Sequence, residues 1–339
     1  MRKRKYLILS GFYFDFNDEL SKIIEIKKSF EKQNILDLYR FDDIDNLYIF
    51  KNKNIYFLYL SKIFSAAYNL SFSSNQIKVL DLSQCINLKF KESDFFVENQ
   101  IKYFRFPKNI DTINCNNKIL YSNIDILDLS QCKKLKSIDE YSFFDNEIKK
   151  LKLSDNIEII KKCAFLSNQI EILDLSNCIN LKIISKCAFE YNQIKQLKLP
   201  KNIAIIGNCS FQHNQIESLD LSNCINLNII SECAFKSNQI KQLKLPKNIE
   251  VMYKDAFKNN KIEMLDLSNC TNLKPIVSNA FAENPLNEIK ILDNINVDYY
   301  NYTDYKDDLW SKFIKYYKNN NNKSGDYKYK DDKWKWYPL

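Results

Sequence analysis

Cysteine is the residue whose number and spacing in this sequence first suggest chemistry. The chain contains ten cysteines in 339 residues. Five of them recur every 46 or 47 residues: Cys85, Cys132, Cys178, Cys224 and Cys270. Four others recur every 22 or 24 residues: Cys163, Cys187, Cys209 and Cys233. Thiols in such series are candidates for disulfides, for a thiolate metal site or for buried core positions, and the choice depends on how the chain places them.

Other kinds of chemistry are poorly supplied. The single histidine, His213, excludes a multi-histidine metal site and leaves little for acid–base catalysis near neutral pH. Three glycines exclude most phosphate-binding loops, which need several close backbone approaches. No Ser-His-Asp or Cys-His pairing can be nominated, and we interpret His213 as a surface-loop residue. We therefore expect no enzymatic activity, no cofactor and no bound metal.

Composition and charge restrict the partners. The net charge is +8, from 50 basic and 42 acidic residues, and no segment is strongly basic, so we expect no nucleic-acid partner. No apolar run reaches the roughly 18–20 residues that a membrane span requires. The basic start, Arg2 to Lys5, precedes a short apolar stretch that Asp15 soon interrupts. We interpret this start as a first strand with a basic flank rather than as a signal peptide.

The cysteine spacing follows an internal repeat that fills the middle of the chain. The clearest copies begin at Gln169 and Gln215 and alternate with a second type that begins at Gln193 and Gln239. Each coil contains Leu-x-Leu, which predicts a short strand with both leucines inward, and then a Cys or Asn at a bend. An isoleucine and a phenylalanine follow, and the phenylalanines form a core column: Phe143, Phe165, Phe189, Phe211, Phe235, Phe257 and Phe281. Each of them precedes an asparagine by three residues.

The pattern Leu-x-Leu-x-x-(Asn/Cys)-x-x-Leu is similar to the leucine-rich-repeat signature. The Cys-Ala-Phe and Leu-Pro-Lys-Asn-Ile segments resemble the BspA-like subclass, which is common on protist and bacterial surfaces and in giant DNA viruses of amoebae. The resemblance covers about residues 55–297. It implies a right-handed β/α superhelical solenoid with mostly short parallel strands, little regular helix and about ten coils of 22–24 residues. It leaves the function open, since such repeats serve many partners.

The flanking segments are expected to cap the solenoid. We place an N-terminal capping region at 1–54, with a helix that Asn17 or Asp18 caps, and the solenoid at 55–297. Residues 298–339 are expected to form a capping helix, begun by Asp308, and a tail that alternates aromatic residues with lysines. This tail is either a small hairpin on the last coil or a stacking contact for a peptide or single-stranded nucleic acid, and we favour the hairpin.

The repeat also decides how the cysteines are interpreted. Coils stack about 4.8 Å apart, so the five-cysteine series, on alternate coils about 10 Å apart, is too widely spaced for disulfides. The series Cys163, Cys187, Cys209 and Cys233 lies on successive coils and is close enough to bridge if the side chains turn correctly. Four sulfurs in a line are not a tetrahedron, which argues against structural zinc. We predict buried core thiols in a reducing compartment, and so an intracellular, cytoplasmic location, in the host if the source is viral.

The residue between the two strand leucines alternates in charge through ten coils. It is Asp81, Arg105, Asp128, Lys152, Asp174, Lys198, Asp220, Lys244, Asp266 and Lys290. These side chains should point outward on the concave sheet, each acid between two bases. The simplest interpretation is a cross-strand charge ladder that fixes the register and neutralises the face.

The residue just before the first leucine varies most. From this series we take Tyr103, Ile126, Ile172 and Met264 as apolar anchors, and from the neighbouring charge ladder we take Asp174, Lys198, Asp220 and Lys244. We take these eight as the candidate binding residues of the concave face, although single exposed apolar residues are also ordinary. The hypothesis is a non-catalytic scaffold for a protein partner of unknown identity. The alternative is a structural or self-assembling surface protein of the BspA-like type, for which self-association is possible.

Overall fold

The computed structural model describes the chain in two compact units. Side chains and backbone are described for 75–83, 99–113, 123–277, 279–297 and 308–339, and the backbone alone for the strands β1 to β4. The first unit comprises Met1–Lys136 and Asp145–Ser154, and the second comprises Ser137–Phe144 and Asp155–Leu339. The helix expected after Asn17, as well as Cys85 and the boundaries at 54 and 298, lie outside the described residues.

The first unit is built on parallel strands of three residues. A hairpin of β1 (Tyr6–Leu9) and β2 (Phe12–Asp15) precedes a sheet in the order β3-β4-β5-β6-β7-β9. The strands of this sheet are β3 (Ile35–Asp37), β4 (Phe57–Tyr59), β5 (Val79–Asp81), β6 (Tyr103–Arg105), β7 (Ile126–Asp128) and β9 (Lys150–Lys152). Leu80, Phe104 and Leu127 pair in register and are fully buried, so the middle of each strand faces the core.

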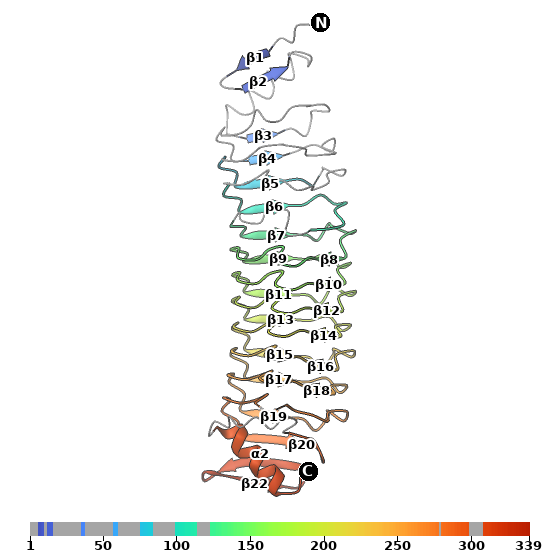
Figure 1. Ribbon diagram of the computed structural model, residues 1–339, viewed down its shortest axis with the longest axis vertical. Helices are drawn as coiled ribbons and strands as arrows, with labels where there is room; N and C mark the ends of the chain where they lie inside the picture. The colour runs from blue at the N-terminus through green and yellow to red at the C-terminus, as the bar shows by residue number, and fades with distance from the viewer. Residues whose placement is uncertain are drawn as a thin grey trace. The chain divides into compact units, whose positions relative to one another are not determined.

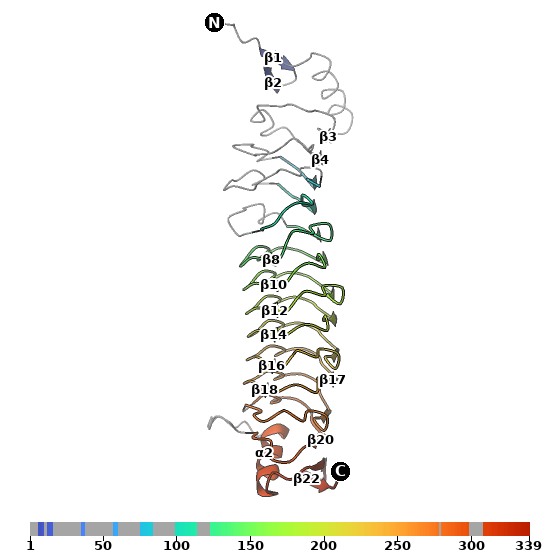
Figure 2. The ribbon, with the colours of Figure 1, turned by 90° about the vertical axis from the view of Figure 1, so that its right-hand side faces the viewer.

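The second unit carries two parallel ladders, which Figure 1 shows on opposite edges of the coils. One ladder has three-residue strands: β11 (Ile172–Asp174), β13 (Gln196–Lys198), β15 (Ser218–Asp220) and β17 (Gln242–Lys244). β19 (Met264–Asp266) and the four-residue β20 (Glu288–Ile291) follow it along the chain and belong to a separate sheet. The other has two-residue strands: β8 (Ser137–Ile138), β10 (Ile159–Ile160), β12 (Ile183–Ile184), β14 (Ile205–Ile206), β16 (Ile229–Ile230) and β18 (Val251–Met252). Figure 2 shows the two-residue ladder face on.

The expected fold class is confirmed. The chain forms a parallel-strand solenoid with little helix and about eight turns. Eight of the expected strands fall between 123 and 297, and β5 and β6 precede them. The two-residue ladder was not predicted from the sequence.

The phenylalanine column is the core of the second unit. Neighbouring rings from Phe143 to Phe281 stack with centroids 5.2–5.5 Å apart and planes within 8° of parallel. Each of these rings is fully buried. Because every coil repeats the same backbone, identical side chains fall on one line and fill the same layer of the core.

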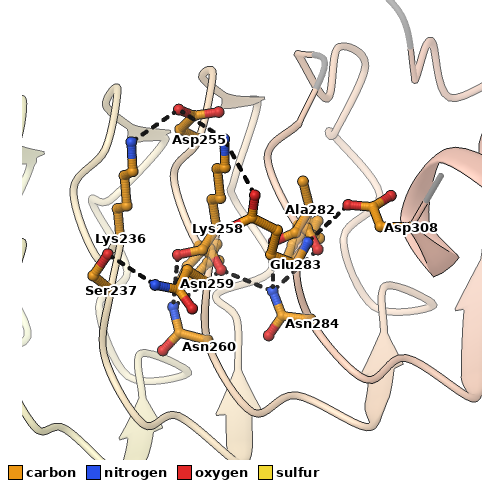
Figure 3. Close-up of polar contacts among 12 residues, drawn as sticks. Lys236, Ser237, Asp255, Lys258, Asn259, Asn260, Ala282, Glu283, Asn284 and Asp308 are labelled. Carbon is orange, nitrogen blue, oxygen red and sulfur yellow. Dashed lines mark hydrogen bonds and ion pairs between the residues drawn. The ribbon is translucent and has the colours of Figure 1, made fainter. Parts of the chain in front are cut away.

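The asparagine three residues after each phenylalanine satisfies backbone groups at the bend. The Asn214 side chain donates to the carbonyls of Phe189 and Phe211 at 2.9 and 3.2 Å, and its Oδ1 accepts from the Ile194 N–H at 3.0 Å. One buried amide therefore joins two coils. Figure 3 shows Asn260 and Asn284 in the same role further along the unit.

The C-terminal segment covers the last coil of the second unit. Helix α2 (Leu309–Asn319) begins at Asp308, whose carboxylate accepts from the Ser311 N–H at 2.8 Å, as the sequence predicted. Trp310 packs edge-on against Phe281 with centroids 5.2 Å apart, so the helix ends the phenylalanine column. The tail forms the antiparallel strands β21 (Gly325–Lys330) and β22 (Lys333–Tyr337), and β21 pairs with β20. The favoured hairpin is therefore present and extends the sheet.

The asparagine amides provide a stability prediction. We expect Asn214→Ala to lower the free energy of unfolding by about 2–4 kcal/mol, because it leaves buried backbone groups of two coils without a partner. Denaturant titration followed by circular dichroism measures this change. The control is Asn202→Ala, whose exposed side chain donates to the Ile179 carbonyl at 2.9 Å. That change should cost less than about 1 kcal/mol, and equal losses in both variants would contradict the proposed role of the buried amide.

Candidate interaction surface and thiol cluster

The outward positions of the three-residue strands in the second unit form an exposed surface, which we call the strand face. It consists of the first and third residues of β11, β13, β15, β17 and β19, and all of them are exposed. The middle residues are inward: Leu173, Leu219 and Leu265 are each 1% exposed. This alternation follows from the two-residue period of a strand.

On the strand face, the aspartates of β11 and β15 each form an ion pair with the lysine of the following coil. Lys198 lies 3.3 Å from Asp174, and Lys244 lies 3.3 Å from Asp220. Each aspartate also accepts from the hydroxyl of the serine two residues later. This hydrogen bond, and then the neighbouring lysine, hold the pKa of Asp174 and of Asp220 below the usual value.

The pairing differs from the expectation of an acid between two bases. β11 pairs with β13, and β15 with β17, through three register pairs each, whereas β13 and β15 share one. The acid-to-base step along the chain is 24 residues and the base-to-acid step is 22. From β11 to β17, the ladder therefore consists of two acid–base couples rather than an even alternation.

The predicted apolar residues fall into two groups. Tyr103 and Ile126 are register partners on β6 and β7 of the first unit and are half-buried. The Arg105 guanidinium lies over the Tyr103 ring at 5.5 Å. Ile172 and Met264 lie on the strand face and are 59% and 54% exposed. They are four coils apart, about 19 Å at the usual strand spacing, so they do not form one apolar patch.

Two exposed isoleucines at equivalent bends were not singled out from the sequence. Ile179 and Ile225 are 54% and 58% exposed at the bends that follow β11 and β15. Their carbonyls accept from Asn202 and Asn248, respectively. Each directly follows a buried cysteine in the sequence. They provide a matched comparison for the apolar residues of the strand face.

The acid–base couples provide a second prediction. Asp174→Lys places two lysines side by side, and we expect it to destabilise the fold by roughly 0.5–1 kcal/mol at low salt. Because the repulsion is between exposed charges, high salt should remove most of the loss. Thermal unfolding at two salt concentrations measures it. Asp174→Asn removes the attraction without adding repulsion and should have about half the effect; a loss that salt does not change would show that the two side chains do not interact.

The described members of the first cysteine series lie in the core, as predicted. Cys178, Cys224 and Cys270 are at most 3% exposed, and burial raises the pKa of each thiol to about 11. Cys224 and Cys270 face the carbonyls of Pro200 and Pro246 at 3.9 Å. The described cysteines are free thiols. These three thiols therefore remain protonated at neutral pH.

The second cysteine series is different because it reaches the edge of the core. Cys163 and Cys187 are buried, whereas Cys209 and Cys233 are half-buried. All four adopt a positive φ of 54–56°. The interaction between the Cys209 and Cys233 thiols lowers the pKa of Cys209 and, together with burial, raises that of Cys233.

A carboxylate joins this cysteine series at one coil. Burial raises the pKa of the Cys187 thiol to about 12, and the neighbouring Glu190 carboxylate adds to this shift. The ligand atoms of Cys187, Glu190 and Cys209 all lie within 4.8 Å of one another. Glu190 therefore adds an oxygen ligand to the sulfurs of this column. The equivalent residues in the neighbouring coils are Leu166, Gln212 and Lys236.

The same column ends in a network of charges. One coil after Cys233, the equivalent position of the column is Asp255, which is 6% exposed. Its Oδ2 lies 3.3 Å from Lys236 and 3.8 Å from Lys258, and Lys258 reaches Glu283 at 3.9 Å. Figure 3 shows this chain of charges and the Asp308 carboxylate, which accepts from the Glu283 N–H at 2.8 Å. The network connects the last coils to the start of α2.

His213 contacts two neighbouring side chains at a bend. Its ring stacks on Tyr191 with centroids 4.5 Å apart, and one ring nitrogen lies 3.1 Å from the Gln212 amide. The residue lies at a bend with a φ of 54°. This agrees with its interpretation as a surface-loop residue.

The contrast between the two cysteine series gives a third prediction. In reduced, metal-free protein at pH 8, we expect iodoacetamide to modify Cys209 at least about 100-fold faster than Cys178, Cys224 and Cys270, because the buried thiols hold little thiolate. Timed alkylation with peptide mapping by mass spectrometry measures the rates. Denatured protein is the control and should react evenly. Similar rates in the folded protein would contradict the assigned burial.

These features define a class of protein. Parallel three-residue strands with inward leucines, a bend residue on every coil and a stacked core are those of a leucine-rich-repeat solenoid. The model of the BspA type leucine rich repeat region matches residues 116–226 and 182–307, in six copies. Together these ranges cover more than half of the chain, and the protein belongs to this family.

Solved structures with a similar fold include three bacterial proteins. The functional domain of InlJ from Listeria monocytogenes, which includes a cysteine ladder, is 20% identical with a TM-score of 0.39, over 70% of this chain and 49% of that one. YopM, a leucine-rich effector protein from Yersinia pestis, is 17% identical with a TM-score of 0.37, over 81% and 86%. A leucine-rich repeat protein from Bacteroides ovatus is 15% identical with a TM-score of 0.29, over 61% and 56%.

The chain thus spans about half the length of the InlJ and Bacteroides ovatus chains. A comparison with curated proteins found no match. Within the described residues, no helix has the length and apolar character needed to cross a membrane.

Proposed function

We propose that the protein is a non-catalytic scaffold that binds a protein partner through the strand face. One observation carries this proposal. The first residues of β11, β13, β15, β17 and β19 are exposed and chemically varied, whereas the inward positions of the same strands repeat leucine. Variation on this face is compatible with the fold because these side chains do not contribute to the core.

The electrostatics of the strand face favour a partner that is recognised at short range. Asp174 and Asp220 are each matched by a lysine at 3.3 Å, so the face carries little net charge. A neutralised face does not attract polyanions over long distances. Affinity then depends on buried apolar contacts and on hydrogen bonds to the polar residues Gln196, Ser218 and Gln242.

The spacing of the apolar side chains sets the minimum length of the surface that a partner must contribute. Ile172 and Met264 are the exposed apolar side chains of the strand face. A single partner that contacts both must extend over four coils, about 19 Å. This extent is typical of a protein surface or an extended segment rather than of a small molecule.

The alternative is the structural, self-assembling role that the family resemblance suggests. In that case the partner is a second copy of the chain. Static light scattering distinguishes the two: the scaffold hypothesis predicts a monomer at high concentration, and concentration-dependent oligomers support the alternative.

A matched pair of variants tests the strand face. We expect Ile172→Asp with Met264→Asp to weaken partner capture at least about 10-fold, because buried anchors dominate interface energy. The control, Ile179→Asp with Ile225→Asp, places the same charges on equally exposed isoleucines at the bends and should leave capture unchanged. The measurement is affinity capture from lysate of the source cell at physiological salt, quantified by mass spectrometry, with thermal unfolding of each variant as the folding check.

Three outcomes would contradict the proposal. Unchanged capture in the strand-face variant would remove this face from the interaction. Equal losses in both variants would indicate a general effect of added charge. Recovery of the bait with itself and no other stoichiometric protein would support the self-associating alternative.

A further inference from the structure

We propose that Cys187, Glu190 and Cys209 bind one thiophilic divalent cation, of which Zn²⁺ is the best match, and that the ion joins two successive coils. The site lies outside the strand face and is independent of the proposed function. Its ligand atoms already lie within 4.8 Å of one another.

The backbone holds the two cysteines in equivalent positions. Cys187 and Cys209 both have a φ of 56°, so their side chains leave the chain in the same direction. The Cys187 N–H donates to the Asn208 carbonyl at 2.9 Å, and this bond fixes the first coil against the second beside the site. The Cys209 N–H donates to the Glu232 carbonyl at 2.9 Å and fixes the second coil in turn.

Glu190 makes the ligand set three-dimensional. It follows Cys187 by three residues, and its N–H donates to the Cys187 carbonyl at 3.4 Å, closing a tight turn. A carboxylate oxygen of Glu190 lies within 4.8 Å of the Cys187 and Cys209 sulfurs. The oxygen adds a third ligand atom close to the two sulfurs of neighbouring coils, so the ligand set is not limited to the column of thiols. In the neighbouring coils, the residues equivalent to Glu190 are Leu166, Gln212 and Lys236, none of which is acidic.

The ligand types select the class of metal. Two thiolates disfavour Mg²⁺ and Ca²⁺, which bind through oxygen, and the carboxylate disfavours Cu⁺, which prefers sulfur alone. Zn²⁺ accepts both, with bonds of about 2.3 Å to sulfur and about 2.0–2.2 Å to carboxylate oxygen. Tetrahedral geometry then requires ligand atoms about 3.5–3.8 Å apart. Rotation of the thiols about χ1 supplies this contraction, and water or the neighbouring Cys233 thiol provides the fourth ligand.

The surrounding charges place the ion at this coil rather than further along the column. Lys186 lies near Cys187 and Cys209, where one positive charge complements three anionic ligands around a divalent ion. Two coils later, Lys236 takes the position of Glu190 and pairs with Asp255 at 3.3 Å (Figure 3). Lys258 adds a second ammonium 3.8 Å from the same carboxylate. A cation is disfavoured beside two lysines, so the metal-binding part of the column ends before Asp255.

Binding of the ion joins two successive coils and stabilises the folded chain. An ion held by residues of both coils binds the folded chain and not the unfolded one, so its stabilisation of the fold grows with the logarithm of its free concentration above the Kd. The ion has no substrate-binding role in this proposal.

Cobalt titration provides the first test. Co²⁺ added to protein reduced with a phosphine should produce thiolate-to-metal charge-transfer absorption and the visible bands of a tetrahedral site, saturating at one equivalent. Zn²⁺ should bleach these bands and raise the thermal unfolding midpoint, and a chelator should reverse both effects.

Variants identify the ligands. We expect Cys187→Ser with Cys209→Ser to abolish the charge-transfer band, and Glu190→Gln to weaken Zn²⁺ binding at least about 10-fold by competition titration. The matched control is Cys163→Ser, which removes a thiol of the same column with the same backbone conformation and should change the affinity less than about threefold. Thermal unfolding of each metal-free variant checks that it is folded.

The proposal is overturned if the wild-type protein gives no charge-transfer band. It is equally overturned if the band persists in the double variant, which would assign the metal to other cysteines. Loss of binding in Cys163→Ser with retention in Glu190→Gln would exclude the carboxylate and replace this ligand set with a thiol-only one.

Discussion

The fold of the second unit depends on satisfying the backbone where each coil bends away from its ladder. The bends turn N–H and carbonyl groups into the core, where an unpaired group is costly. One buried asparagine per coil resolves this, because its amide donates to the phenylalanine carbonyls of two coils and accepts an N–H from the preceding one. The phenylalanines can stack at 5.2–5.5 Å because these amides hold successive coils at a constant spacing.

This constraint turns sequence position into a line in space. Once every coil has the same backbone, each repeat position becomes a column, and the properties of the column decide its role. The Cys178 column is sealed in the core, the Cys187 column reaches the edge of the core, and the Asp174 column is exposed. A residue that differs from the rest of its column gives one coil a property that its neighbours lack, and Glu190 is the clearest case.

Much of the fold could be predicted because the repeat supplies the same evidence many times. The leucine strands, the phenylalanine core and the Asp308 cap follow from periodicity and from one N-cap residue. The Ile183–Ile184 type of strand was missed because two residues show no alternation. The one-sided pairing of Asp174 with Lys198 was missed because it depends on the coil lengths of 24 and 22 residues. Glu190 was missed because a single departure has no periodicity, and its meaning depends on a side chain of the next coil.

The acid–base couples have an evolutionary consequence. One couple, such as Asp174 with Lys198, spans two coils, and the pattern repeats after 46 residues. The two strands of a couple share three register pairs, whereas neighbouring strands of successive couples share one. Unequal recombination that removed or inserted a single coil would bring two acids or two bases face to face and join coils of the wrong length. An exchange of whole couples preserves every contact. Genes for such arrays are therefore expected to grow and shrink in steps of two coils, with an even number of coils separating allelic variants.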